Sequence, residues 1–159
     1  MPATKIKQFL DENLVRYVSI RHSPAYTAQE IAASAHISGR EMAKTVMVNL
    51  DDSMDMVVLR ATDMLDLNRL RKLAGARTAT LASEEEFARM FPDCEAGAMP
   101  PFGNLYDMSV YVDRALTYDE HIAFNAGSHA ELIQMTYDDF QRLVEPVVAE
   151  LTSRVPVHA

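Results

Sequence analysis

The chain has 159 residues, of which 48% are hydrophobic and 24% charged, and this composition predicts one globular domain over residues 1–159 with a single hydrophobic core. Its formal net charge of −8 argues against a general nucleic-acid-binding protein, because such proteins hold the phosphate backbone with a basic face. No apolar run is long enough to span a bilayer, the N-terminus lacks the apolar block of a secretion signal, and the single cysteine, Cys94, has no internal disulfide partner, so we expect a cytoplasmic protein.

Two helices and one strand are predicted in the first forty residues. The first helix follows Thr4, a residue type that commonly caps helices. Its apolar face consists of residues at helical spacing, namely Ile6, Phe9, Leu10 and Leu14. Residues 15–21 form a hydrophobic run that predicts a strand, and residues 27–30 have the form of a capping box that opens a short helix ending near Ala35.

Residues 45–50 and 54–60 are β-rich runs around the turn sequence Asp51-Asp52-Ser53, which predicts a hairpin. After it we expect a helix over 67–74, between the cap Asp66 and the stop Gly75, and a strand over 78–81. A second helix begins at the capping box 83–86 and ends before Pro92, and strands follow over 105–112, 121–126 and 130–135. The last helix begins at Thr136, has Phe140, Leu143 and Val144 on one face, and is kinked or split by Pro146. Because strands outnumber helices and several are joined by hairpins, the pattern favours a mixed α+β fold.

A single lysine, Lys44, stands where a turn containing Gly39 runs into an apolar, β-branched strand. Lysine side chains are normally exposed, so one interpretation is a solvated charge at the start of the strand. The other interpretation is functional, because a compact ammonium group at a strand edge suits a phosphate or a carboxylate.

Residues 94–103 predict a rigid loop, because glycines and prolines fix its backbone while its main-chain polar groups are free to face a ligand. The same composition is also common in a plain connection between a helix and a strand. No cluster of His, Cys and carboxylate residues has the spacing of a metal site, so we expect no metal and no other cofactor. Cys94 lacks a neighbouring histidine that would activate its thiol.

Five stretches are informative through their joint order along the chain. They are His22-Ser23-Pro24-Ala25-Tyr26-Thr27-Ala28-Gln29-Glu30, Ala43-Lys44-Thr45-Val46, Gly97-Ala98-Met99-Pro100-Pro101-Phe102-Gly103, Val112-Asp113 and Ala126-Gly127-Ser128-His129. In this order they resemble the YbaK-type aminoacyl-tRNA deacylases, which are related to the editing domain inserted in bacterial prolyl-tRNA synthetases. The resemblance extends from about Ile6 to Pro146 and implies a single α+β domain with a curved, barrel-like mixed β-sheet flanked by helices.

The resemblance implies catalytic roles for two residues, Lys44 and His129. Lys44 falls on a lysine that related deacylases require, and it would contact the phosphate or ester region of the terminal adenosine. His129 would position water or limit side-chain size, and its alternative is an ordinary turn histidine. The residues expected to bind substrate or shape its pocket are His22, Tyr26, Thr45, Gly97, Met99, Pro100, Pro101, Phe102, Asp113, Gly127 and Ser128.

For several of these residues the sequence also allows a role other than substrate binding. Tyr26 suits a packing role, and Asp113 suits either the orientation of a neighbour or the end of a strand. Met99 and Phe102 are expected to form the apolar wall of the pocket. Thr45 stands where some relatives carry an asparagine beside the lysine, so the selected amino acid stays open.

The function that the resemblance implies is trans-editing, in which the ester of a mischarged tRNA carrying alanine, serine, threonine or cysteine is hydrolysed. In the family, the terminal ribose hydroxyl is thought to help activate the attacking water. Prolyl-tRNA is the commonest partner there, so tRNA-Pro and an aminoacyl-tRNA synthetase are the expected partners, and DNA and membranes are not. The chain has one dense basic cluster, which consists of Arg69, Arg71, Lys72 and Arg77. This cluster is either a solvated helix face or a contact for the acceptor stem.

Two other functions stay open at this point. One is a non-catalytic nucleotide- or protein-binding module that regulates a synthetase, which the acidic net charge favours. The other is a hydrolase for unrelated small esters, which needs Lys44 but not the basic cluster.

Overall fold

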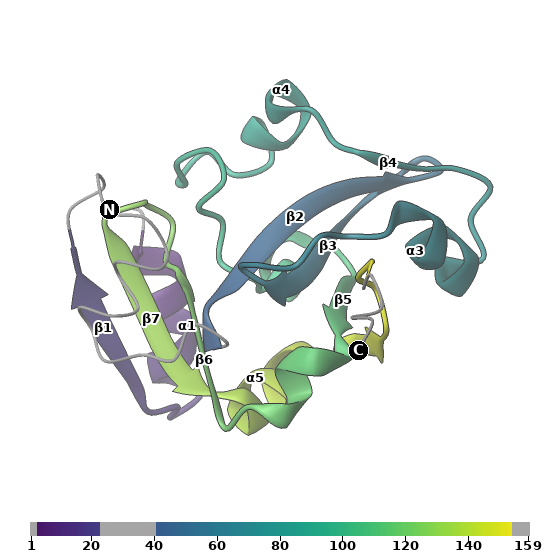
Figure 1. Ribbon diagram of the computed structural model, residues 1–159. Coiled ribbons are helices and arrows are strands. Elements are labelled where there is room, and N and C mark those ends of the chain that lie inside the picture. The colour runs from purple at the N-terminus through teal and green to yellow at the C-terminus, as the bar shows by residue number, and fades with distance from the viewer. Residues whose placement is uncertain (1–2, 23–40, 154–159) are drawn as a thin grey trace.

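The structure is a computed structural model that describes residues 3–22 and 41–153 (Figure 1). Tyr26 and the helix expected from residue 27 lie outside the described residues. None of the helices in the described ranges is long and apolar enough to cross a membrane. The elements are α1 (Thr4–Glu12), β1 (Tyr17–Arg21), β2 (Ala43–Leu50), β3 (Ser53–Arg60), α3 (Leu67–Ala74), β4 (Ala79–Leu81), α4 (Glu84–Ala88), the 3₁₀ helix η2 (Gly103–Tyr106), β5 (Val110–Asp113), the 3₁₀ helix η3 (Arg114–Tyr118), β6 (His121–Asn125), β7 (Glu131–Thr136), α5 (Tyr137–Val144) and β8 (Val147–Ala149).

The described strands form two sheets that meet near the start of β2 (Figure 1). One is a three-stranded antiparallel sheet in the order β1-β7-β6. The other has the order β4-β2-β3-β5-β8 and is mixed, because β2 runs antiparallel to β3 and β4 whereas β3, β5 and β8 run parallel. An isolated bridge between Met42 and Ala123 links the two. The prediction of an α+β fold with a mixed sheet is confirmed, although the described strands do not close into a barrel.

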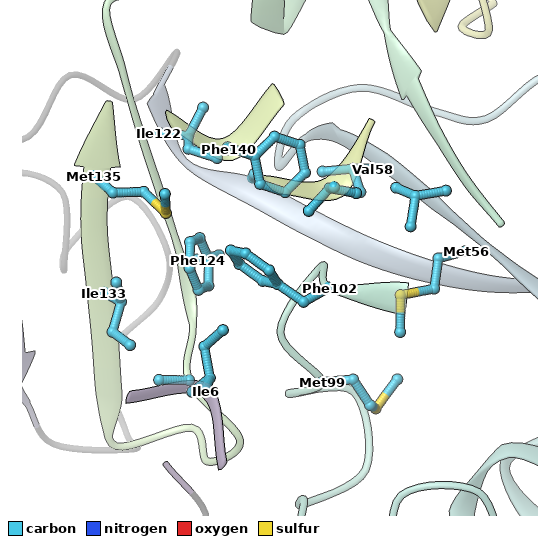
Figure 2. Packing of buried hydrophobic residues seen from close by; sticks show 14 of the residues in the cluster. Ile6, Met56, Val58, Met99, Phe102, Ile122, Phe124, Ile133, Met135 and Phe140 are labelled. Atoms are coloured by element: carbon cyan, nitrogen blue, oxygen red, sulfur yellow. The ribbon is translucent and has the colours of Figure 1, made fainter. Parts of the chain in front are cut away.

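The main hydrophobic core lies between the two sheets and is centred on phenylalanine rings (Figure 2). Phe102 is fully buried, and its ring centroid lies 6.0 Å from that of Phe9, 5.6 Å from that of Phe124 and 5.4 Å from that of Phe140. Edge-to-face and tilted aromatic pairs at such separations add to the stabilisation from area burial alone. These contacts join α1, the loop after α4, β6 and α5 in one cluster.

Local capping signals account for most helix boundaries. The Asp66 carboxylate accepts hydrogen bonds from the amides of Asn68 and Arg69 at the start of α3, and Gly75 ends that helix with φ 67°. The predicted capping box of α4, formed by Ser83 and Glu86, is also present. At α1 the prediction is wrong, because Ala3 occupies the N-cap position without a side-chain hydrogen bond and Thr4 is already helical.

The prediction also fails where tertiary contacts override local patterns. Leu14 was expected on the buried face of the first helix, but it follows the helix end with φ 57° and is 91% exposed. The strand expected from residue 105 begins at Val110 instead, because the preceding residues form η2. Pro146 neither kinks nor splits α5: the helix stops before the left-handed Glu145, and an unpredicted strand, β8, follows.

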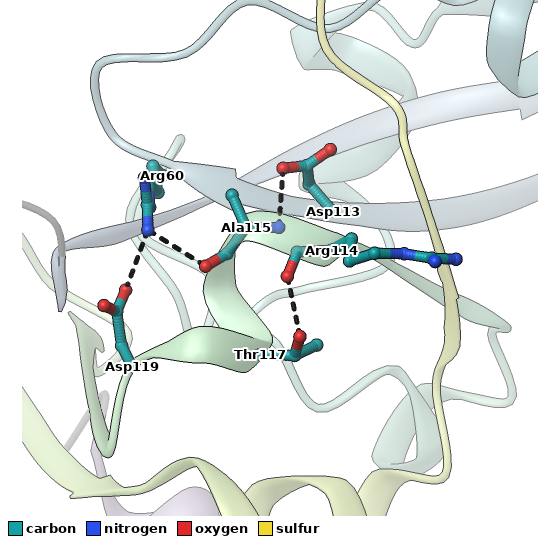
Figure 3. A network of polar contacts seen from close by, with 6 residues as sticks. All are labelled: Arg60, Asp113, Arg114, Ala115, Thr117 and Asp119. Carbon is teal, nitrogen blue, oxygen red and sulfur yellow. Dashed lines mark hydrogen bonds and ion pairs between the residues drawn. The ribbon is translucent and has the colours of Figure 1, made fainter.

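Polar contacts around Asp113 join the end of β5 to η3 and to the C-terminal segment. The buried Asp113 carboxylate accepts hydrogen bonds from the amide of Ala115 at 3.1 Å and from the amide of Leu151 at 2.8 Å. Arg60 donates to the carbonyl of Ala115 at 3.0 Å and forms an ion pair with Asp119 at 3.5 Å, so η3 is held from both ends (Figure 3). Asp113 thus serves as the cap that ends this strand.

Replacing Asp113 with Ala should lower the free energy of unfolding by about 3 kcal/mol, because two backbone donors would lose a charged acceptor in a buried setting. Chemical denaturation of wild type and variant measures the difference. Asp113→Asn is the matched control, since its single carbonyl oxygen satisfies one donor and should recover part of the loss. An equal loss in both variants would mean that the negative charge, and not the hydrogen bonds, stabilises this junction.

Candidate functional site

A cavity of about 220 Å³ lies along the edge of β2 where its pairing with β4 ends. The ladder between these strands reaches only to Val48 and Leu81, and the amide of Ala82 then donates to the carbonyl of Met47 at 3.0 Å. We call this space the β2-edge cavity. Its lining residues are Thr45, Val46, Met47, Leu81, Ala82, Phe87, Gly97 and Met99.

Three residues that the sequence nominated for the substrate pocket meet in this cavity: Thr45, Gly97 and Met99. They come from β2 and from the glycine- and proline-rich loop, which lie about fifty residues apart in the chain. Met99 is 3% exposed and Gly97 adopts φ 79°. Thr45 is the residue of the lining with a polar side chain, so the cavity suits a small and mainly apolar group.

The loop is bound to the turn between β6 and β7 by main-chain hydrogen bonds. The amide of Glu95 donates to the carbonyl of Gly127 at 2.8 Å, and the amide of Gly127 donates to the carbonyl of Ala98 at 2.8 Å. The Glu95 carboxylate also accepts a hydrogen bond of 2.7 Å from the amide of His129. Two predicted site segments are therefore fixed against each other.

The His129 ring lies against this loop. Its Nε2 is 2.7 Å from the carbonyl oxygen of Ala96, and a Cβ added to Gly97 would lie 3.6 Å from its Cε1. Because a carbonyl only accepts hydrogen bonds, Nε2 must carry a proton, and in the neutral ring Nδ1 then keeps the lone pair. The sequence alone predicted no partner that orients His129. The Ala96 carbonyl, which contacts the ring, leaves no signal in the sequence, whereas the Glu95 carboxylate, which holds the His129 amide, lies in the predicted loop and was missed.

Lys44 is the second residue of β2 and is partly exposed. The register pairs Lys44 with Leu59 and Thr45 with Val58, so the two neighbouring side chains lie on opposite faces of the strand pair. Thr45 lines the β2-edge cavity, whereas Lys44 is not among its lining residues. The structure thus brings Lys44 to the strand that borders the cavity but not into its wall.

Ser128 lines a second cavity, of about 210 Å³, which does not share lining residues with the first. Lys7, Arg21 and Glu131 also line it, and Lys7 forms an ion pair with the buried Glu131. Burial raises the pKa of Glu131, but hydrogen bonds from Lys7 and Ser19 outweigh it and bring this pKa below its usual value.

His22 belongs to the same region as this second cavity. Its amide donates to the carbonyl of Ala130 at 2.9 Å, which ties the end of β1 to the turn that carries His129. The nominated residue His22 is therefore held beside this turn by a backbone hydrogen bond.

Besides Lys44 and the residues around the β6–β7 turn, four more nominated residues do not line the β2-edge cavity: Pro100, Pro101, Phe102 and Asp113. Pro100 and Pro101 belong to the loop and are buried. Phe102 was expected to form the pocket wall, but its ring is in the aromatic core and fully buried. The Asp113 carboxylate is occupied by two backbone amides, which supports its strand-end alternative.

The basic cluster is partly neutralised by acidic neighbours. Arg69 lies 3.6 Å from the Asp66 carboxylate and 3.8 Å from that of Glu150. Arg77 lines a cavity together with Asp51 and Asp52. Among the described residues, Arg71 and Lys72 are therefore the stronger candidates in this cluster for contacting a polyanion.

Two further expectations concern reactive groups. Burial raises the pKa of the Cys94 thiol, which disfavours the reactive thiolate. Within residues 3–22 and 41–153, no group of three or more His, Cys, Asp or Glu side chains is arranged to hold a metal ion.

Comparison with known proteins gives consistent similarities. Residues 22–143 match the aminoacyl-tRNA editing domain family. The prolyl-tRNA editing protein ProX of Acetoanaerobium sticklandii is 24% identical over 142 residues, which cover 86% of each chain. A proline–tRNA ligase of Shouchella clausii is 32% identical over 105 residues, which cover 65% of this chain but only 18% of the ligase. A crystal structure of a candidate trans-editing enzyme for prolyl-tRNA synthetase has a TM-score of 0.84 and 19% identity, covering 96% of this chain and 98% of its own.

Replacing Gly97 with Ala should lower the free energy of unfolding by roughly 1 kcal/mol, because a Cβ is strained at positive φ. The added methyl would meet the His129 ring at 3.6 Å, an ordinary contact, so no steric cost is expected. Gly75→Ala is the matched control, since Gly75 also has positive φ and a Cβ there would meet nothing within 4 Å. Thermal or chemical unfolding should give similar losses, and a much larger loss for Gly97→Ala would contradict the packing described here.

Proposed function

We propose that this chain, which belongs to the aminoacyl-tRNA editing domain family and is an aminoacyl-tRNA deacylase, acts in trans and removes a small amino acid from a mischarged tRNA. The observation that carries this proposal is the β2-edge cavity, in which the edge of β2 and the Gly97–Met99 loop meet. The cavity would receive the amino acid side chain, and the ester bond would lie at its mouth.

The lining of the cavity supports a ranking of the four candidate amino acids. An apolar wall accepts the methyl group of alanine or the thiol of cysteine at lower desolvation cost than a hydroxyl group. Thr45 supplies one side-chain hydroxyl that can pair with serine or threonine. We therefore expect alanine and cysteine to be preferred, with modest discrimination against serine, because apolar pockets reject an added hydroxyl only weakly.

The chemistry proposed for the site needs no protein nucleophile. An aminoacyl ester is already activated, so positioning a water molecule and stabilising the developing oxyanion can supply the rate acceleration. With Nε2 of His129 donating to the Ala96 carbonyl, Nδ1 is the ring atom that can accept a proton from water. Lys44 would hold the phosphate or ester region of the terminal adenosine by charge.

The likeness to a prolyl-tRNA editing protein supports tRNA-Pro as the partner, and another relative is a proline–tRNA ligase. Lys44 shares its face of the five-stranded sheet with Leu59, and α3 packs on this face through Leu70. An acceptor stem that follows this face from Lys44 would meet Arg71 and Lys72 on α3. Such limited contact is compatible with the acidic net charge.

Lys44→Ala should abolish deacylation while the protein stays folded, because the side chain is partly exposed and contributes little to the core. The measurement is release of alanine, serine, threonine and cysteine from charged tRNA by wild type and variant. Lys5→Ala is the control, since it also removes one lysine charge, but Lys5 lies over the Tyr106 ring and is not on β2. Unchanged rates in a folded Lys44→Ala protein would refute the role of Lys44.

Reversing the charges of Arg71 and Lys72 to Glu separates tRNA editing from hydrolysis of unrelated small esters. The double variant should lose activity on charged tRNA, with a reduced salt dependence, because fewer phosphates would be neutralised. Activity on a small amino acid ester should persist. Equal activity of wild type and double variant on tRNA would mean that the acceptor stem does not follow α3.

A further inference from the structure

One wall of the β2-edge cavity comes from a helix that cannot stand alone. The helix α4 has five residues, fewer than an isolated helix needs to be stable in water. Its position therefore depends on its contacts with the rest of the protein.

Glu86 accepts two hydrogen bonds through its two carboxylate oxygens, one within the helix cap and one from β2. Oε1 accepts a hydrogen bond from the amide of Ser83 at 3.0 Å and so closes the capping box. Oε2 accepts a hydrogen bond of 2.9 Å from the Asn49 side chain on β2. A single carboxylate thus stabilises the first turn of α4 and fastens this turn to the strand that borders the cavity.

Phe87 is the next residue along the helix and lines the cavity. Its ring is partly buried against the main core, which it touches at the same time. Two other lining residues are less adjustable, because Gly97 has no side chain and Met99 is almost fully buried. Phe87 is therefore a bulky, partly buried group of the lining, and its position depends on how α4 is held.

From these contacts we propose that Phe87 is a specificity-determining residue that sets the largest amino acid side chain the cavity accepts, and that Glu86 is a positioning residue that holds Phe87 through Asn49. This inference rests on the proposed deacylase function and adds to it the wall that excludes larger amino acids. One methylene group changes such discrimination by roughly 10- to 200-fold, so removing an aromatic ring should relax the exclusion strongly.

The first experiment compares esters of different size on one tRNA. Wild type, Phe87→Ala and Phe87→Leu are assayed on that tRNA charged with alanine, valine or leucine. For Phe87→Ala the ratio of kcat/KM for valyl- over alanyl-tRNA should rise on the order of 10- to 100-fold, with a smaller rise for Phe87→Leu. Because Phe87 also touches the core, thermal unfolding accompanies each variant, and Phe87→Leu carries the test if Phe87→Ala does not fold.

The second experiment isolates the positioning role of Glu86. Glu86→Gln keeps one acceptor oxygen for two donors, and should raise the same valyl-to-alanyl ratio severalfold. Glu85→Gln removes the same charge from the same helix turn and should leave this ratio unchanged. In a Phe87→Ala background, Glu86→Gln should have no further effect on the ratio, because the group that it positions is gone.

The outcomes separate this inference from the function on which it rests. If wild type releases alanine and the Phe87 variants keep the wild-type ratio, the inference is overturned and the deacylase function stands. If Glu86→Gln shifts the ratio equally with and without Phe87, its action through Phe87 is overturned. If wild type hydrolyses neither these esters nor those of serine, threonine and cysteine, the proposed function and this inference both fall.

Discussion

The candidate site depends on how the edge of β2 is shared among its neighbours. At one end β2 pairs with β4 through Val48, Asn49 and Leu50, and at the other end Met42 forms a bridge with Ala123 of β6. Between these contacts neither β4 nor β6 continues along the edge, which leaves room for a cavity. Thr45, Val46 and Met47 of this stretch line the cavity, while the opposite edge of β2 is fully paired with β3.

Main-chain groups shape the site as much as side chains do. Gly97 has a backbone conformation that favours glycine, and the loop around it bonds to the turn at Gly127 in both directions. His129 is oriented by a backbone carbonyl and its own amide is held by Glu95. A site built in this way keeps its shape through the fold of the loop, so that few side chains need to be dedicated to binding.

Local signals in the sequence predicted local structure, but they did not predict the contacts between distant segments. The caps at Asp66 and Ser83 and the hairpin of β2 and β3 follow from neighbouring residues, which a linear reading can see. Phe102 was misjudged because its loop suggested a pocket, whereas three rings from other elements draw it into the core. Thr45, Gly97 and Met99 were nominated through the family resemblance, but Phe87 was not, since only the fold brings α4 to β2.

The pairing of β1 with β7 has a consequence for how the protein is made. Tyr17 lies opposite Met135, so the first strand finds its partner only near the end of the chain. During synthesis from the N-terminus, the β2–β3 hairpin can form early, but the three-stranded sheet must wait until β7 has left the ribosome. The second cavity and the turn that carries His129 are therefore completed late, and a nascent chain stalled before residue 129 would contain the β2 edge without this histidine.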